Sequence, residues 1–280
     1  MRNKWYIVVF VWLCGAEAFG QSPWIPTPKQ WIVTPSITYQ NYNKFWMGKQ
    51  KVSTPFADEV NQLNFLVSVE YGLMEDIALD FTSGYTWAEA EGSTLNDIDG
   101  VADTLLGVRW TFLDEFKTEC PYAPTLTLRL GGIIEGSYDK SFPHSPGDGA
   151  SGGDLSLLFG KSFGDTGFGT YGNIGYRIRT DHVPDDFFSA VGFYKTFCDS
   201  ITASVGYRMT QGLSGLDIAG PGFTPDRFPE TKEINHNVEF GLSYLDKGGR
   251  LYSFLYARTL DGRNTSEKDV FSFAVSFYFD

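Results

Sequence analysis

The sequence has few cysteine, histidine and methionine residues and no block of consecutive basic residues. Three of its 280 residues are Cys, three are His and four are Met, and 34 Asp and Glu outnumber 22 Lys and Arg. Three Cys cannot form a disulfide scaffold, and the scattered His and Cys follow no zinc-binding pattern. Because an acidic chain cannot neutralise phosphates, a nucleic-acid partner is excluded. No apolar run approaches the roughly 20 residues of a spanning helix, which excludes a helical membrane protein.

The chain is instead rich in aromatic residues and glycine. It holds 24 Phe, 15 Tyr, 7 Trp and 31 Gly, yet its mean hydropathy is −0.18. An aromatic-rich chain that is hydrophilic on average needs an explanation, and the order of its residues supplies one.

The first twenty residues predict a secretory signal peptide. Arg2 and Lys4 precede the apolar run Tyr6–Cys14, and the small residues of 15–20 follow. This order is typical of a cleaved signal, here after Gly20, with cleavage after Ala18 as the alternative. Nine apolar residues are too few for a membrane anchor, and the bulky residues before Cys14 argue against lipidation. We expect export across the inner membrane and one mature domain over residues 21–280.

Beyond residue 20, apolar and polar residues alternate with a period of two. In Val270–Phe279 the odd positions are mostly Phe and the even positions include Ser and Ala; Ile201–Met209 and Ile234–Leu245 alternate in the same way. Period two with one apolar face predicts β-strands. About twelve such strands are expected, near residues 31–42, 60–71, 76–88, 101–113, 124–135, 152–163, 168–180, 185–197, 200–211, 234–245, 250–260 and 269–279.

Short and long connections alternate between these strands. Gly72–Glu75, Gly164–Gly167, Cys198–Asp199 and Asp246–Gly249 are tight turns, whereas residues 43–59 and 212–233 are long and rich in Gly, Pro and Asp. This order predicts an all-β fold: a transmembrane antiparallel up-and-down β-barrel of about 12 strands, with short periplasmic turns and longer outer loops.

A soluble β-sandwich is the alternative fold. Strands of about ten residues are long for a sandwich but suit a bilayer crossing, and the polar faces hold Gly, Ser, Thr and single charges, as a wet lumen does. We therefore expect the bacterial outer membrane as the location and its lipid as a partner. The aromatic strand Phe277–Phe279 predicts contact with the barrel-assembly machinery, although Asp280 follows the last Phe.

Alternation also predicts which charged side chains point into the lumen. They either set the electric field of an open pore or fill a closed lumen as ion pairs. Neighbouring strands suggest pairing of Asp103 and Arg109 with Arg129, and of Asp154 with Arg177. The inward set is Glu70, Asp80, Asp103, Arg109, Arg129, Glu135, Asp154, Arg177, Arg179, Arg208 and Glu239.

Three further groups of residues leave alternatives open. His236, between Asn235 and Asn237, is the best candidate base for a membrane-embedded hydrolase, but no Ser motif accompanies it, and we expect no catalytic, metal or cofactor site. Cys120 and Cys198 lie in predicted periplasmic turns and are either bridged or separate thiols. Aromatic residues of the long loops either dock a solute, constrict the mouth or anchor the loops at the interface: Phe45, Trp46, Phe56, Phe142, Phe223 and Phe228.

Two stretches resemble a known family. Gly72-Leu73 leads into an acidic turn, and Gly100–Trp110 contains a Gly-x-x-Asp-x-x-x-Gly-x-Arg strand. Both resemble the outer-membrane transporters assigned to the meta-cleavage pathway of phenol degradation, through the whole mature chain. The resemblance implies a barrel for small-molecule passage. Fatty-acid and aromatic-hydrocarbon channels fit less well, because this chain lacks their length and their N-terminal plug.

Together these features predict a channel for the passive uptake of small, hydrophobic or aromatic solutes, without cofactors or enzymatic activity. A non-transporting structural or surface-interaction barrel with a plugged lumen is the alternative, and a hydrolase comes third. The sequence does not specify the solute, the oligomeric state or whether the lumen is open.

Overall fold

The computed structural model describes residues 22–280 except residue 141. The predicted signal peptide, residues 1–20, lies outside the described residues. The rest folds into strands joined by turns and loops, two of which contain a short 3-10 helix. Within the described residues no helix is long and apolar enough to cross a bilayer. The elements are β1 (Trp31–Tyr42), β2 (Lys44–Met47), β3 (Gln50–Ser53), β4 (Glu59–Gly72), β5 (Ile77–Glu91), β6 (Ile98–Val101), β7 (Thr104–Leu113), β8 (Thr125–Ile134), β9 (Gly152–Ser162), η1 (Gly164–Thr166), β10 (Phe168–Arg179), β11 (Asp186–Phe197), β12 (Ile201–Gly212), η2 (Pro225–Glu230), β13 (Ile234–Leu245), β14 (Leu251–Arg263) and β15 (Asp269–Phe279).

Twelve antiparallel strands close into a barrel, as the sequence predicts. Strand β1 pairs with β4 on one side and with the last strand, β15, on the other. The first and last strands align from Trp31 opposite Phe279 to Asn41 opposite Asp269. Closure leaves none of the twelve barrel strands at an open edge of the sheet, which is the condition for placing β structure in a bilayer.

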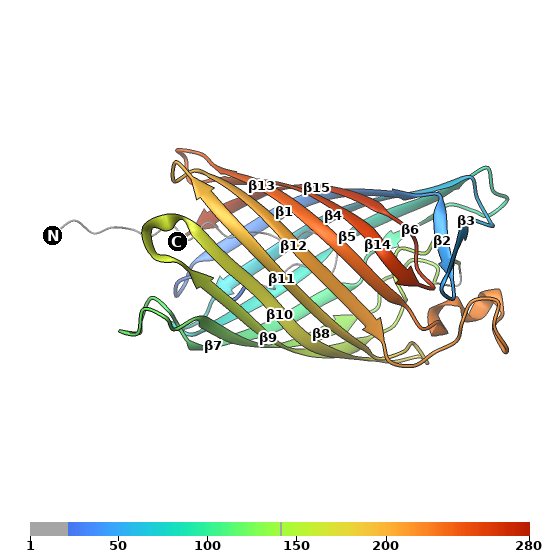
Figure 1. The fold of residues 1–280 in the computed structure, drawn as a ribbon, viewed down its shortest axis with the longest axis horizontal. Helices are drawn as coiled ribbons and strands as arrows, with labels where there is room; N and C mark the ends of the chain where they lie inside the picture. Colours follow the sequence, from blue (N-terminus) through green and yellow to red (C-terminus); the bar gives the residue numbers. More distant parts are fainter. Residues whose placement is uncertain (1–21, 141) are drawn as a thin grey trace.

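The two ends of the barrel differ (Figure 1). The C-terminus and the tight turns lie at one end, here called the turn end; hairpin β2–β3 and η2 lie at the other, here called the loop end. At the turn end, the Ser200 N–H donates to the Phe197 carbonyl at 3.2 Å, and the two residues between them, Cys198 and Asp199, both have positive φ values, 52° and 58°, as the central residues of a type I′ turn do.

The two faces of the strands differ as predicted. Large apolar side chains such as Phe240, Phe254 and Phe273 are exposed on the outer face, between 45% and 49%. Small hydroxyl side chains pair across strands on the inner face, including Thr34 with Ser276 at 2.9 Å and Thr38 with Ser272 at 2.8 Å. The outer face is therefore suited to lipid, and the inner wall is polar.

The structure refines the predicted elements in two places. The expected strand 101–113 is interrupted at residues 102–103, and β5 pairs with β7 along Ile77–Thr82 and with β6 along Tyr85–Ala88. The expected loop 43–59 contains hairpin β2–β3, whose residue Phe45 forms a bridge to Ser266. Neither feature shows clean alternation over enough residues to be predicted.

A charge on the outer face should destabilise the barrel according to depth. Phe273 lies opposite Ile37 near the middle of β1, whereas Phe197 ends β11. Phe273→Arg is expected to lower the free energy of unfolding by about 2–4 kcal/mol, and the control Phe197→Arg by about 0–1 kcal/mol. Guanidinium titration of the protein folded in lipid vesicles measures both; equal losses would contradict the assigned lipid-facing surface.

Candidate functional site: the barrel lumen

Five ion-paired side chains cross the lumen wall from β4 to β9 and are here called the charge belt. They are Glu70, Asp80, Arg109, Arg129 and Asp154. Arg109 pairs with Glu70, and its Nε lies 3.4 Å from Asp80 Oδ1. Arg129 lies 2.9 Å from Asp80 and 2.8 Å from Asp154. All five are buried, so the pairs offset a desolvation cost of several kcal/mol per ion.

Two glycines make room for this belt. A Cβ at Gly107 would lie 2.3 Å from an Asp80 oxygen, and a Cβ at Gly131 would lie 2.3 Å from Arg129 Nη1. No side chain fits at either position. Gly107 and Arg109 are the last two residues of the motif that resembles the phenol-degradation family, and here the motif brings a guanidinium against the wall.

The remaining predicted charges form separate pairs. Arg208 Nε lies 2.8 Å from Glu239 Oε1, and Arg177 lies 3.6 Å from Asp186. At the loop end, Arg179, the last residue of β10, pairs with Asp148 at 2.7 Å, and Glu135, which follows β8, pairs with Lys140 at 2.8 Å. The predicted inward charges therefore lie in the lumen or at its loop end as ion pairs, except Asp103.

The expected pairing of Asp103 is wrong. Asp103 pairs with neither Arg109 nor Arg129; its carboxylate accepts hydrogen bonds from the Gly136 N–H at 2.9 Å and the Tyr138 hydroxyl at 2.8 Å. Asp154 lies opposite Arg177 in the register and forms an ion pair with Arg129. The break between β6 and β7 displaces Asp103 toward the loop end, which adjacency in the sequence does not reveal.

The N-terminal segment, residues 22–30, enters the lumen at the turn end. Trp24 is 6% exposed, and its indole N–H donates to Glu115 Oε1 at 3.1 Å. The Thr127 hydroxyl donates to the Pro23 carbonyl at 2.6 Å, and Arg109 donates to the Ser22 carbonyl at 3.2 Å. The segment thus contacts the inner wall and one member of the charge belt.

This segment is short, and the sequence carries one signal of it: Pro23, Pro26 and Pro28 lie around a single Trp. A turn leads from it into β1, where the Gln30 N–H donates to the Thr27 carbonyl at 3.0 Å and Lys29 has a φ of 70°. A side chain at Gly160 would approach Trp24 to 2.6 Å, so β9 leaves space for the indole.

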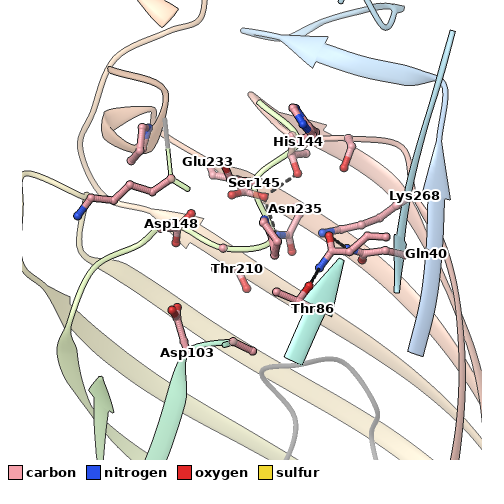
Figure 2. A pocket seen from close by; sticks show the side chains of 18 of the residues that line it. Gln40, Thr86, Asp103, His144, Ser145, Asp148, Thr210, Glu233, Asn235 and Lys268 are labelled. Atoms are coloured by element: carbon pink, nitrogen blue, oxygen red, sulfur yellow. Dashed lines mark hydrogen bonds between the residues drawn. The ribbon is translucent and has the colours of Figure 1, made fainter. Parts of the chain in front are cut away.

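A cavity of about 320 Å³, here called the outer chamber, occupies the loop half of the lumen (Figure 2). Gln40, Thr86, Thr210 and Asn235 present amide and hydroxyl groups to it from the strands, while Glu233 lies beside Asn235 in the same view. Burial, reinforced by Asp148, raises the pKa of Glu233. Uncharged hydrogen-bonding groups therefore dominate the strand walls of this chamber.

Aromatic loop residues cover the outer chamber. Phe45 packs against Tyr42 and against Phe228, with ring centroids 6.5 and 6.0 Å apart, and Phe56 joins this cluster. Phe142 packs against a second cluster around Tyr138. Trp46 is 3% exposed, and Phe223 lies in the loop before η2. Of the three roles left open by the sequence, this packing favours a constriction of the mouth.

The Asn264 side chain joins the β2–β3 hairpin and the long loop between β12 and β13 through hydrogen bonds to their backbone. Its side-chain amide donates to the carbonyls of Leu216 and Lys232, at 3.2 and 2.9 Å, and its oxygen accepts from the N–H groups of Gly48 and Ile218. Its φ is 49°, a conformation that Asn tolerates better than most residues. Sequence analysis missed Asn264 because its partners lie 32 to 216 residues away.

The structure separates the residues considered for catalysis. His236 lies on the outer face, where it is hydrogen-bonded to the Tyr207 hydroxyl, whereas Asn235 and Asn237 line the outer chamber. Strand alternation splits this trio, so it cannot act on one substrate. His144 is buried in the loop over the chamber and contacts the Asn96 carbonyl at 3.0 Å; burial lowers its pKa.

Cys120 and Cys198 are free and exposed, so no disulfide joins them. Their turns connect β7 to β8 and β11 to β12. With strands about 4.8 Å apart, the nearer strands of these turns are about 14 Å apart along the wall, beyond the Cα separation that a disulfide spans.

No protein-family model matches the chain, and no curated protein matches its sequence. Solved structures do match its fold. The COG4313 outer membrane channel from Pseudomonas putida F1 has a TM-score of 0.74 at 13% identity, over 93% of this chain and 98% of that chain. The fold is that of an outer-membrane β-barrel. The family resemblance read from the sequence is not confirmed and stays a prediction.

Two other solved barrels match less well. The translocator domain of the autotransporter NalP from Neisseria meningitidis has a TM-score of 0.52 at 10% identity, over 91% of this chain and 90% of that chain. A mutant of the TodX monoaromatic hydrocarbon channel has a TM-score of 0.48 at 11% identity, over 90% of each chain. At these identities the likeness extends to the fold alone.

Removing the Arg129 guanidinium group at the centre of the charge belt should destabilise the folded barrel. Arg129→Ala leaves Asp80 and Asp154 buried without their shared partner, and breaking a buried pair this way costs about 3–5 kcal/mol. We expect Arg129→Ala to lower strongly the guanidinium chloride concentration at the midpoint of unfolding. The triple variant, which adds Asp80→Asn and Asp154→Asn, should recover most of the lost stability. Arg258→Ala, at an exposed outer-face pair, is the matched control; similar midpoints for R129A and R258A would contradict the role of the belt.

The N-terminal segment should limit ion flow. Deleting residues 22–29 removes Trp24 and its neighbours from the lumen while leaving β1 whole, so single-channel conductance in planar bilayers is expected to rise at least twofold. Trp31→Ala, on the outer face at 46% exposure, is the control and should leave conductance unchanged. An unaltered conductance in the deletion variant would show that the segment does not obstruct the lumen.

Proposed function

We propose that this protein is an outer-membrane channel through which small molecules pass passively along their concentration gradient. The observation that carries the proposal is the outer chamber, a cavity of about 320 Å³ enclosed by the polar inner wall of a closed barrel. The fold it shares with an outer membrane channel supports the same function. Outer-membrane barrels have short turns on the periplasmic side and longer loops on the outer side, so in the proposed orientation the turn end faces the periplasm and the loop end faces the medium.

The proposed path has two parts with different chemistry. A solute that enters between the loops first meets the outer chamber, whose walls carry both uncharged hydrogen-bonding groups and charged side chains, most of them paired. It then meets the charge belt and the segment around Trp24, which narrow the lumen toward the turn end. Because the charged side chains of the belt form ion pairs with one another, a solute that passes them meets no unpaired charge. Displacement of residues 22–30 would widen this second part.

The sequence suggests hydrophobic or aromatic solutes, and we keep them as one proposed class. Two aromatic clusters at the chamber roof support this class, one with Tyr42, Phe45 and Phe228 and the other with Phe142, because rings that line a mouth bind apolar solutes as they enter. No catalytic role is proposed.

A non-transporting barrel is the second candidate function. The observation that favours it is the contact of Trp24 with Glu115 and Tyr194, which places a large side chain in the lumen. In that case the loops joined by Asn264 would be the functional surface, and the lumen would serve stability alone.

Solute flux separates the two candidates. Proteoliposomes are diluted into isotonic solutions of neutral solutes of about 90 to 350 Da, and swelling is followed by light scattering. We expect swelling rates that fall steeply with solute size and exceed those of protein-free vesicles. The protein's heat-modifiable gel migration verifies folding; a folded barrel with no flux for any solute would remove the channel and leave the non-transporting barrel.

A further inference from the structure

The outer chamber presents more hydrogen-bonding side chains than passive passage of a solute requires. Two groups of uncharged polar side chains line it. On one side, Gln62 donates to Asn64 at 2.9 Å and the Thr86 hydroxyl donates to the same Asn64 oxygen at 2.5 Å. On the other side, beyond β14 and β15, Asn237 donates to Asn235 at 3.2 Å, with Thr210 opposite Asn235 in the register. Amides offer a donor and an acceptor each.

A small apolar patch separates the two polar groups. Ala257 on β14 lies directly opposite Val270 on β15, and both line the cavity together with Leu66. These residues belong to the apolar cluster of the inner wall. The chamber thus presents hydrogen-bonding groups on two sides of an apolar surface.

Two of the charged side chains of the chamber have neighbours of opposite charge. Glu239 is 4% exposed, and its Oε1 accepts a hydrogen bond from Arg208 Nε at 2.8 Å. The Lys268 ammonium, which lines the same cavity (Figure 2), is attracted electrostatically by the Glu233 carboxylate. The uncharged amides and hydroxyls are therefore the groups that offer hydrogen bonds to a ligand.

The charges of the chamber argue for an uncharged ligand. Five acidic and five basic side chains line it, so their formal charges cancel, and most of these groups are already paired. A purely aromatic ligand would cover the amides of Asn64, Asn235 and Asn237 without bonding to them, which is unfavourable for each amide.

We propose that the outer chamber is a binding site for a neutral, polyhydroxylated ring compound of monosaccharide size. The apolar face of such a ring packs on Ala257 and Val270, and its hydroxyl groups reach the amides on both sides. A cavity of about 320 Å³ is at the lower end of the range for ligand pockets. The inference adds a second solute class to the apolar one proposed for the channel, and in that respect it rests on the proposed function; as a binding site, it is tested separately.

Saturation-transfer NMR tests the site on the folded protein in a detergent that has no sugar group. Methyl β-glucoside is the probe, with phenol and glucuronate as the aromatic and anionic comparisons. We expect saturation of the ring protons of the glucoside and at least fivefold weaker binding of the other two. Tighter binding of phenol, or no saturation of the glucoside, would overturn the proposal.

Substitution locates the site. Asn237→Leu removes both hydrogen-bonding atoms of one amide and should weaken glucoside binding at least tenfold; Thr34→Val, on the inner wall outside the chamber, is the matched control and should not change it. If Asn237→Leu does not fold, Thr210→Val is measured in its place, with an expected loss of at least threefold. Equal binding by the wild type and the chamber variant would contradict the site.

The flux assay keeps the two proposals distinguishable. Glucoside binding without any solute flux would retain the site and remove the channel. Flux that does not distinguish the glucoside from other solutes of its size, together with no binding, would retain the channel and remove the site.

Discussion

The structure depends on one constraint: in a bilayer, every backbone N–H and C=O must be bonded within the protein. Pairing of β1 with β15, from Trp31 opposite Phe279, meets this constraint by closing the sheet. Closure gives each strand one face toward lipid and one toward a lumen, and the alternating sequence follows from those two surroundings. The apparent contradiction between abundant aromatic residues and a hydrophilic average disappears, because the aromatic side chains lie on one face and the Gly, Ser, Thr and charged residues on the other.

Closure also places charged side chains inside the barrel, and the two halves of the lumen accommodate them differently. Toward the turn end, carboxylates and guanidinium groups are packed into the charge belt, with Gly107 and Gly131 leaving the space they need, and the segment around Trp24 covers it. Toward the loop end, amides and hydroxyls share the wall of a cavity with charged side chains, most of which form ion pairs of their own. The same fold therefore contains a rigid, paired half and a half in which polar groups remain available to a solute.

The sequence predicted the features that arise from local periodicity. Twelve strands, their inward and outward faces and the tight turn at Cys198 and Asp199 all follow from alternation and turn chemistry. Features that depend on distant contacts were not predicted. Asp103 bonds to Tyr138 because a break separates β6 from β7. Trp24 packs against residues that come together only in the assembled lumen, and Asn264 bonds to loops that meet only after the barrel closes. His236 shows the converse, since its neighbours Asn235 and Asn237 are adjacent in sequence yet lie on the opposite face.

The division of the lumen is most directly tested by thiol accessibility in intact outer membranes. In a background with Cys120→Ser and Cys198→Ser, a cysteine is placed at Thr210 in the outer chamber or at Thr111, which is buried beside Thr127 under the N-terminal segment. A membrane-impermeant methanethiosulfonate reagent added outside should modify Thr210→Cys at least tenfold faster than Thr111→Cys. Equal rates at the two positions would contradict an open outer chamber above an obstructed turn end.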